Sequence, residues 1–264
     1  MLRNFSVRKF AVLLMIIAFG SISASAYGPT GHRVIAELAS LHLTPEARLA
    51  VEAILGDEFM AEASTMPDEM RSNPEEFWQR EAGPYHYINV SPGQTYEESE
   101  KNPAGDALTA LEKFAAVLKD DTASAEDKRR AIWFVIHIIG DLHQPLHIGH
   151  PEDRGGNWVD VVWMEELTNL HRVWDEHIID HRDLSFTEWT RFLNRKIKPE
   201  MITEWQTAQP IDWVHEGLVM RDDIYANSHG ILSWDYVYRY MPTVKSQLSK
   251  GGVRLAGYLN TVFK

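Results

Sequence analysis

Histidine and aspartate occur at metal-ligand spacing within an apolar stretch that runs from Trp133 to His147, WFVIHIIGDLHQPLH. His137 and Asp141 are four residues apart, so on a helix both side chains project from the same face. Pro145 ends such a helix and places His147 on a turn just beyond it. Imidazole and carboxylate groups are metal ligands, and here they stand at helix positions where apolar core residues are expected. The alternative is a buried helix whose polar side chains are only hydrogen-bonded.

The same spacing occurs again in NLHRVWDEHII, where His171 and Asp175 are four residues apart. With His147, the two pairs supply five ligands of the types that zinc prefers, imidazole nitrogen and carboxylate oxygen. Asp68 in MPDEMR and His86 in PYHYINV lie upstream, in proline-rich sequence. Taken alone, each of these two is better explained as a turn residue or a packed residue.

The first 26 residues have the features of a secretory signal peptide. Three basic residues precede an apolar run from Phe10 to Gly20, and the small residues Ala24 to Ala26 fit a cleavage site. The run is too short to span a membrane, and no later stretch reaches about 18 apolar residues. We therefore expect a signal peptide over 1–26, cleavage after Ala26, a mature domain over 27–264 in the periplasm or secreted, and no membrane span.

Charge and cysteine content narrow the possible partners. The chain has 264 residues, a net charge of −12 and no cysteine. Removing the leader with its three basic residues leaves −15 on the mature chain. Such a charge argues against broad electrostatic binding of nucleic acid, so an anionic substrate needs a local positive centre. An exported chain without disulfides also needs another source of stability, which converging metal ligands can provide.

Apolar spacing and capping signals predict helices over most of the mature chain. Residues 57–104 hold five prolines and are expected to be mostly loop, and residues 157–163 to form one short strand or hairpin. We find no repeat and no flexible linker, so the expected fold is all-α, a single helical domain with long loops. The predicted helices are 31–43, 45–56, 105–119, a central helix that ends before Pro145, 167–182, 185–196, 198–208, 211–227 and 243–262.

The expected mature N-terminus, YGPTGH, adds another set of ligands. A free α-amine has a pKa of about 7.7–8.0, low enough to lose its proton to a metal near neutral pH. The amine and the carbonyl oxygen of Tyr27 can therefore chelate one ion, with His32 as a third ligand.

Together these motifs resemble those of the zinc-dependent single-strand nucleases of the S1/P1 type, which share a fold with bacterial phospholipase C. The resemblance extends from Tyr27 to about Tyr225 and rests on the spacing of the whole set. The matching segments are the mature N-terminus with a histidine five residues on, PD-x-x-R, YHYIN, H-x-x-x-D-x-H-Q-P-L-H, GGN and NLH-x-x-WD.

The resemblance implies three zinc ions and a ligand set for each. Three zinc ions and three carboxylates have a formal charge of about +3, which would be the local positive centre that the acidic chain needs. The implied sets are Asp68, His86, His137 and Asp141 for one ion, His147, His171 and Asp175 for another, and the Tyr27 amine and carbonyl, His32 and a bridging Asp141 for the third.

The resemblance also implies hydrolysis of single-stranded RNA and DNA to 5′-phosphorylated mononucleotides, with removal of terminal 3′-phosphates. Zinc would activate a water for attack on phosphorus, Asp68 would orient that water, and Arg71 would stabilise the charge on the phosphorane oxygens. Tyr87 matches an aromatic on which relatives stack a base; the alternative is a core tyrosine. Asn89 stands where many relatives have a base-reading aspartate, so base preference stays open.

Two other functions compete with this hypothesis. One is a zinc-dependent phospholipase C, because fold and metals are shared, and the other is a zinc-binding or storage protein without turnover.

Tyr27 departs from the tryptophan usual in the family, although its chelating atoms belong to the backbone. His143 lies off the face of Asp141 and is expected to be structural, and no stable protein partner is implied.

Overall fold

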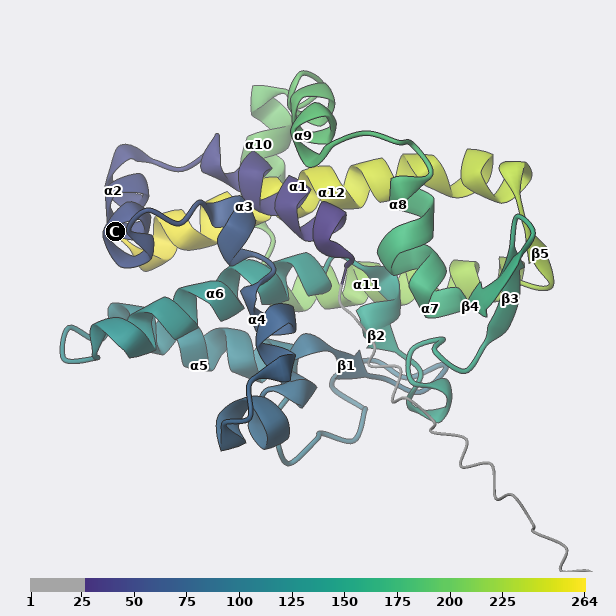
Figure 1. Cartoon of the computed structure of the whole chain (residues 1–264), viewed down its shortest axis with the longest axis horizontal. Helices are drawn as coiled ribbons and strands as arrows, with labels where there is room; N and C mark the ends of the chain where they lie inside the picture. Colours follow the sequence, from purple (N-terminus) through teal and green to yellow (C-terminus); the bar gives the residue numbers. More distant parts are fainter. Residues whose placement is uncertain (1–26) are drawn as a thin grey trace, which may run out of the picture.

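The computed structural model describes residues 27–264, and the predicted signal peptide lies outside them. Helices dominate this part of the chain, which confirms the predicted all-α class (Figure 1). The longer helices are α1 (Pro29–Ser40), α2 (Pro45–Leu55), α5 (Ala107–Lys119), α6 (Ala125–Asp141), α9 (Phe186–Asn194), α10 (Pro199–Thr207), α11 (Pro210–Asn227) and α12 (Trp234–Val262). The shorter helices are α3 (Met60–Ala63), α4 (Met66–Glu69), α7 (Leu170–Arg172) and α8 (Ile178–Asp180).

Single turns of tighter or wider helix interrupt the loops, and three of them carry candidate ligands. Two are 3-10 turns, Gly83–His86 and Pro145–His147, and the third is the π-helical turn Val173–His177. π-Helical turns are rare and often occur at functional sites. The remaining turns are Met70–Ser72, Phe77–Glu81 and Pro151–Asp153.

Helix α6 is the central element of the core. Its start is stabilised by Ser124, whose hydroxyl accepts a hydrogen bond from the Asp127 backbone N–H, as expected of an N-cap. The second half of α6 is buried on all sides, because α6 packs on α5 and also contacts α1, α2 and α12. Phe134 of α6 stacks on Phe114 of α5 with ring centroids 4.5 Å apart. A helix packed this tightly is a rigid support for side chains at its C-terminal end.

Two small sheets complete the fold. Strand β1 (Ile88–Asn89) pairs in parallel with β2 (Ile148–Gly149), so the two histidine-bearing 3-10 turns that precede them lie together. Strands β3 (Asp160–Trp163) and β4 (Glu166–Asn169) form an antiparallel hairpin, and β5 (Ile231–Leu232) pairs in parallel with β3. The hairpin predicted in this region is therefore confirmed, although it begins later than expected.

Three predicted helix boundaries are wrong. The helix expected over 31–43 ends at Ser40. The helix expected over 167–182 begins only at Leu170, because the preceding residues belong to β4 and the Asn169 side chain caps the helix by accepting from the Arg172 N–H. Helix α12 begins at Trp234, not at 243, and continues through Pro242. Pro242 is exposed, so the carbonyl that loses its partner can bond to water. None of the helices in residues 27–264 has both the length and the apolarity that crossing a bilayer requires.

Candidate metal centre

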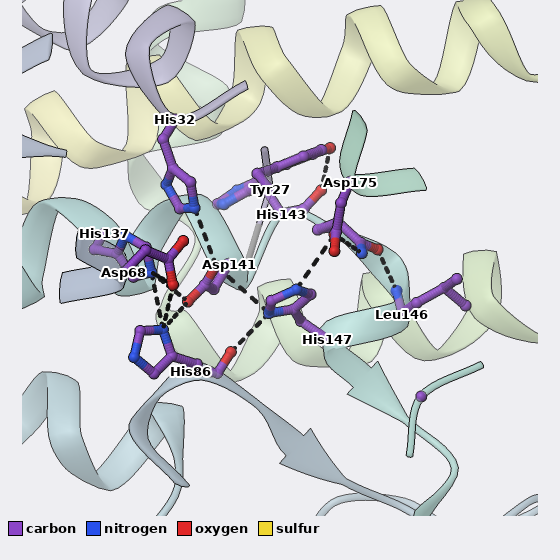
Figure 2. A network of polar contacts seen from close by, with 12 residues as sticks. Tyr27, His32, Asp68, His86, His137, Asp141, His143, Leu146, His147 and Asp175 are labelled. Atoms are coloured by element: carbon purple, nitrogen blue, oxygen red, sulfur yellow. Dashed lines mark hydrogen bonds and ion pairs between the residues drawn. The ribbon is translucent and has the colours of Figure 1, made fainter. Parts of the chain in front are cut away.

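The predicted ligand side chains converge from six separate segments of the fold, and Figure 2 shows most of them. All of these side chains except that of Asp68 are less than 6 % exposed. They gather into three groups in which one ligand atom per residue lies within 4.8 Å of the others. The groups are His32, His137 and Asp141; Asp68, His86 and His137; and His147, His171 and Asp175.

Asp141, at the end of α6, lies between the first two groups and touches the third. Its Oδ1 atom is 3.3 Å from Nε2 of His32 and 3.4 Å from Nδ1 of His147. Its Oδ2 atom is 3.2 Å from Nε2 of His137 and 3.3 Å from Nδ1 of His86. The carboxylate is fully buried, and neither of its oxygens accepts a hydrogen bond from any of residues 27–264.

Backbone carbonyls fix the protonation of three of the imidazoles. Nδ1 of His137 donates to the Ser64 carbonyl, Nδ1 of His147 donates to the His86 carbonyl, and Nδ1 of His171 donates to the Gly155 carbonyl, each over 2.7 Å. A carbonyl oxygen only accepts, so in the neutral ring the proton is on Nδ1 and the lone pair is on Nε2. This arrangement orients a histidine for metal binding.

The third group is held by contacts around Asp175. Its Oδ2 atom is 3.2 Å from Nε2 of His171, and its Oδ1 atom is 3.5 Å from Nε2 of His147. Gln144 donates from Nε2 to Oδ1 of Asp175 over 2.6 Å and accepts from the Leu146 N–H over 2.6 Å. The glutamine therefore fixes the carboxylate without occupying the oxygen that faces His171.

These distances and the chemistry of the donors fit bound metal. Two ligand atoms of a tetrahedral zinc ion lie about 3.3 Å apart, because each is about 2.0–2.1 Å from the ion. The distances from Asp141 to Nε2 of His32 and His137 are of that size, and so are those from Asp175 to Nε2 of His147 and His171. Nε2 of His32, His147 and His171 is buried without a hydrogen-bond partner among residues 27–264. A buried lone pair without a partner is energetically unfavourable. A cation held between these nitrogen atoms would supply the missing partner.

The electrostatics of the centre also favour a cation. Burial would raise the pKa of the Asp141 carboxyl, but His137 and His147 beside it hold that pKa well below its usual range. Burial lowers the pKa of His86 to about 4. Burial also opposes protonation of His147, but the carboxylates of Asp141 and Asp175 outweigh it and raise its pKa to about 9. Protons and metal therefore compete for the same lone pairs.

A model of the S1/P1 nuclease family matches residues 27–264. The chain belongs to the S1/P1 nuclease family. Among its relatives, Endonuclease 2 of Arabidopsis thaliana is 27% identical over 96% of this chain and 97% of its own length. Nuclease S1 of Aspergillus oryzae is 27% identical over 89% of this chain and 91% of its own length. Nuclease P1 of Penicillium citrinum is 26% identical over 89% of this chain and 97% of its own length. The family expected from the motifs is confirmed, and the protein is a nuclease.

In this nuclease His143 and the start of the described chain also have defined places. His143 is buried, donates from Nδ1 to the Ile139 carbonyl and contacts Arg254 through Nε2, so it faces away from the three ligand groups. Tyr27 is buried, and its hydroxyl donates to the His143 carbonyl over 3.0 Å. The next residue, Gly28, donates from its backbone N–H to the Asp175 carbonyl over 2.8 Å. The start of the described chain is therefore anchored beside the ligands.

The predicted catalytic and substrate-binding residues lie at the open side of the nuclease's centre. The Asp68 and Arg71 side chains are 18% and 29% exposed, and Nη2 of Arg71 is 3.0 Å from Oδ1 of Asp68. Tyr87 is 37% exposed, so it is not a core residue. With Asn89 it lines a cavity of about 540 Å³. Tyr87 directly follows His86 in the chain, so the cavity is joined to one ligand group through the backbone, although none of the predicted ligand side chains lines it.

Several supporting residues were not identified from the sequence. Gln144 is one, and its position between two histidines of the HQPLH motif was the available signal. Two glycines are the others. A Cβ on Gly140 would lie 2.6 Å from Nδ1 of His32, and one on Gly155 would lie 2.5 Å from the Leu146 carbonyl oxygen. The absence of a side chain at Gly140 therefore leaves room for the His32 ring. The absence of one at Gly155 allows the tight turn whose carbonyl accepts from Nδ1 of His171.

Proposed function

We propose that this nuclease is a zinc-dependent endonuclease that cuts single-stranded RNA and DNA to 5′-phosphorylated products. The observation that carries the proposal is the convergence of three histidine–aspartate groups on Asp141, next to a cavity lined by an exposed tyrosine. Removal of terminal 3′-phosphates belongs to the same proposal, since it cleaves the same phosphorus–oxygen bond without requiring a second nucleotide.

The donor set favours zinc. The three groups combine imidazole nitrogens with carboxylate oxygens, a mixture that suits zinc, whereas magnesium and calcium take oxygen ligands almost exclusively. The ligands would be distributed over three ions. One ion would be held by Asp68, His86, His137 and Asp141, another by His147, His171 and Asp175, and a third by His32, Asp141 and the amine and carbonyl of Tyr27.

Zinc in these sites would supply Lewis acidity and lower the pKa of a nearby water. The protein's own catalytic groups would then be Asp68 and Arg71. Burial would raise the pKa of the Asp68 carboxyl, but His137 and Arg71 hold it below its usual range, so Asp68 stays ionised and can accept a hydrogen bond that orients the attacking water. Arg71, which is partly exposed, donates to the phosphate oxygens as negative charge grows on them.

Tyr87 and Asn89 would select the substrate. An exposed aromatic ring at the edge of a cavity can stack an unpaired base, and stacking requires the base to be free of its complement. The Asn89 amide offers both a donor and an acceptor to the edge of such a base. This arrangement supports a preference for single strands over duplex.

We further propose that the protein works outside the cytoplasm after a signal peptide over 1–26 has been removed. The basic and apolar pattern of that segment supports export. Cleavage after Ala26 would give Tyr27 a free amine, and Tyr27 is already packed beside the ligand groups. The mature nuclease would then comprise residues 27–264 as one domain.

The test is a set of assays on purified mature protein. Single-stranded DNA, single-stranded RNA, duplex of the same sequence and phosphatidylcholine are each incubated with and without a chelator, and bound metal is measured by elemental analysis. We expect about three zinc ions per chain and rapid cleavage of the single strands that stops on chelation. One zinc or none in active protein would contradict the three-ion centre, and release of the lipid headgroup instead of nucleotides would indicate a phospholipase C.

A further inference from the structure

A second concentration of positive charge lies on a different part of the surface. The loop after α8, helix α9 with the residues that follow it, and helix α12 enclose a cavity of about 360 Å³. Four cationic side chains line it, Arg182, Arg195, Lys196 and Lys245. None of the metal ligands and none of the residues around Tyr87 belongs to it. The whole chain has a net charge of −12, so a cavity lined by four cationic side chains is a local region of opposite charge.

The four cations lack carboxylate partners. None of them forms an ion pair within residues 27–264, whereas Arg254 and Lys250 both pair with Glu216 nearby on the fold. The pKa of Lys245 is below its usual value, because burial disfavours the ammonium and the charges of Arg182 and Lys196 repel it. Cationic side chains held close together without a counter-charge repel one another, and a bound anion would reduce that repulsion.

The cavity also offers aromatic and hydrogen-bonding surface. Trp189 lines it and is 1% exposed, and its indole N–H has no hydrogen-bond partner in the described chain. A buried N–H of this kind usually has an acceptor. Phe192 lines the same cavity and is 43% exposed, so part of its side chain is accessible to a ligand. Cations beside an exposed ring are the features that bind a phosphate with its neighbouring base.

We propose that this cavity binds a phosphodiester group of single-stranded nucleic acid, as an attachment site separate from the metal centre. The cations neutralise the phosphate, and Phe192 stacks an adjoining base. The inference rests on the proposed action of the nuclease on single strands. In Figure 1, α9 lies at the top of the molecule and β1, which carries Asn89, lies towards the bottom. A strand must therefore be long to occupy both sites, and short substrates gain nothing from the second one.

The test compares two double variants with the same loss of charge. Lys196→Gln with Lys245→Gln removes two cations from the cavity, and Lys128→Gln with Lys264→Gln removes two cations elsewhere. The KM and kcat of each are measured on a long single-stranded homopolymer and on a dinucleotide, over a range of salt. We expect the cavity variant to raise the KM of the long strand about tenfold and to leave the dinucleotide unchanged. The slope of log KM against log salt should fall by about 1.4 for two lost phosphate contacts.

The zinc content of both variants should equal that of the parent, and neither should melt at a lower temperature, because the four substituted side chains are exposed or only partly buried. The proposal is overturned if the cavity variant and the control variant have the same KM and the same salt slope. It is also overturned if the dinucleotide is affected as much as the long strand, or if inorganic phosphate binds the cavity and the strand does not.

A binding measurement separates this inference from the proposed function. Fluorescence anisotropy of a labelled phosphorothioate single strand is recorded with the parent and both variants, with no turnover required. If the parent cuts no nucleic acid, the proposed single-strand activity fails, but weaker binding by the cavity variant alone would still support the attachment site. Equal binding by all three proteins would overturn it.

Discussion

Nε2 of His32, on the first helix of the described chain, lies 3.3 Å from Oδ1 of Asp141 at the end of α6 (Figure 2). The other oxygen of the same carboxylate lies 3.2 Å from Nε2 of His137. One aspartate thus joins ligand groups supplied by segments that are far apart in sequence. Since α6 is fixed by packing on its neighbours, the position of this carboxylate determines where the other ligands must converge.

Asp141→Asn should therefore reduce activity more than Asp175→Asn. In the proposed centre Asp141 serves two ions, and the amide of asparagine cannot carry the charge that both require, whereas Asp175 serves one ion. We expect a loss on the order of 100-fold or more for Asp141→Asn, with lower zinc content and lower melting temperature. The measurements are kcat/KM on single-stranded RNA and elemental analysis of both variants. Equal losses in the two would contradict the bridging role.

Gly140→Ala tests whether His32 is a ligand without changing any ligand. The new Cβ would lie 2.6 Å from Nδ1 of the buried His32 ring, so the ring would have to shift from its position beside Asp141. We expect the loss of one zinc ion, a loss of activity of about 10- to 100-fold and a destabilisation of about 1–3 kcal/mol.

Gly83→Ala is the matched control for this substitution. A Cβ at Gly83 meets no atom within 4 Å, so zinc content, activity and stability should stay at parental values. If Gly140→Ala retains full zinc and full activity, His32 does not bind metal in the way proposed.

Tyr87→Ala should weaken binding of single strands and narrow their advantage over duplex. Stacking of one base contributes about 1–3 kcal/mol, so KM should rise about tenfold or more while kcat changes less. Tyr238→Ala is the control, because Tyr238 is 87% exposed on α12 and lines none of the cavities described. An unchanged KM in Tyr87→Ala would mean that the exposed ring is not the stacking platform.

The amine of Tyr27 can be tested by adding a single residue before it. Extension turns the amine into an amide, whose nitrogen has no lone pair to give a metal at ordinary pH, so one zinc ion and most activity should be lost. A tag after Lys264 should be harmless, and Tyr27→Trp should be tolerated because the chelating atoms are in the backbone. The comparison is of zinc content and rate for the free and extended forms; identical values would exclude the amine as a ligand.

The ligand pairs were predictable from the sequence because a helix fixes their geometry. Two residues four apart on an apolar helix must share a face, and the structure places His137 with Asp141 and His171 with Asp175. The convergence of the pairs was not predictable from periodicity, since it depends on how loops cross. It was expected only because the whole set of motifs resembled one family.

The supporting contacts could not be predicted, because most of them involve backbone atoms. The carbonyls of Ser64 and Gly155 orient ligand histidines, yet any residue type has a carbonyl.

The start of α12 was misplaced for a different reason. Proline normally ends a helix, but Pro242 is at the surface, where water replaces the lost hydrogen bond, so tertiary packing of the rest of α12 prevails.

His86 contributes to the centre through two different atoms. Its ring belongs to the group around Asp68, while its carbonyl accepts from Nδ1 of His147, which belongs to the group around Asp175. An ion that immobilises the His86 ring therefore also positions the backbone that orients His147. By thermodynamic linkage the reverse would hold equally, so in the proposed centre the uptake of metal at the two places should be cooperative. Titration of the metal-free protein would then give a sigmoidal curve, and partly loaded molecules would be rare.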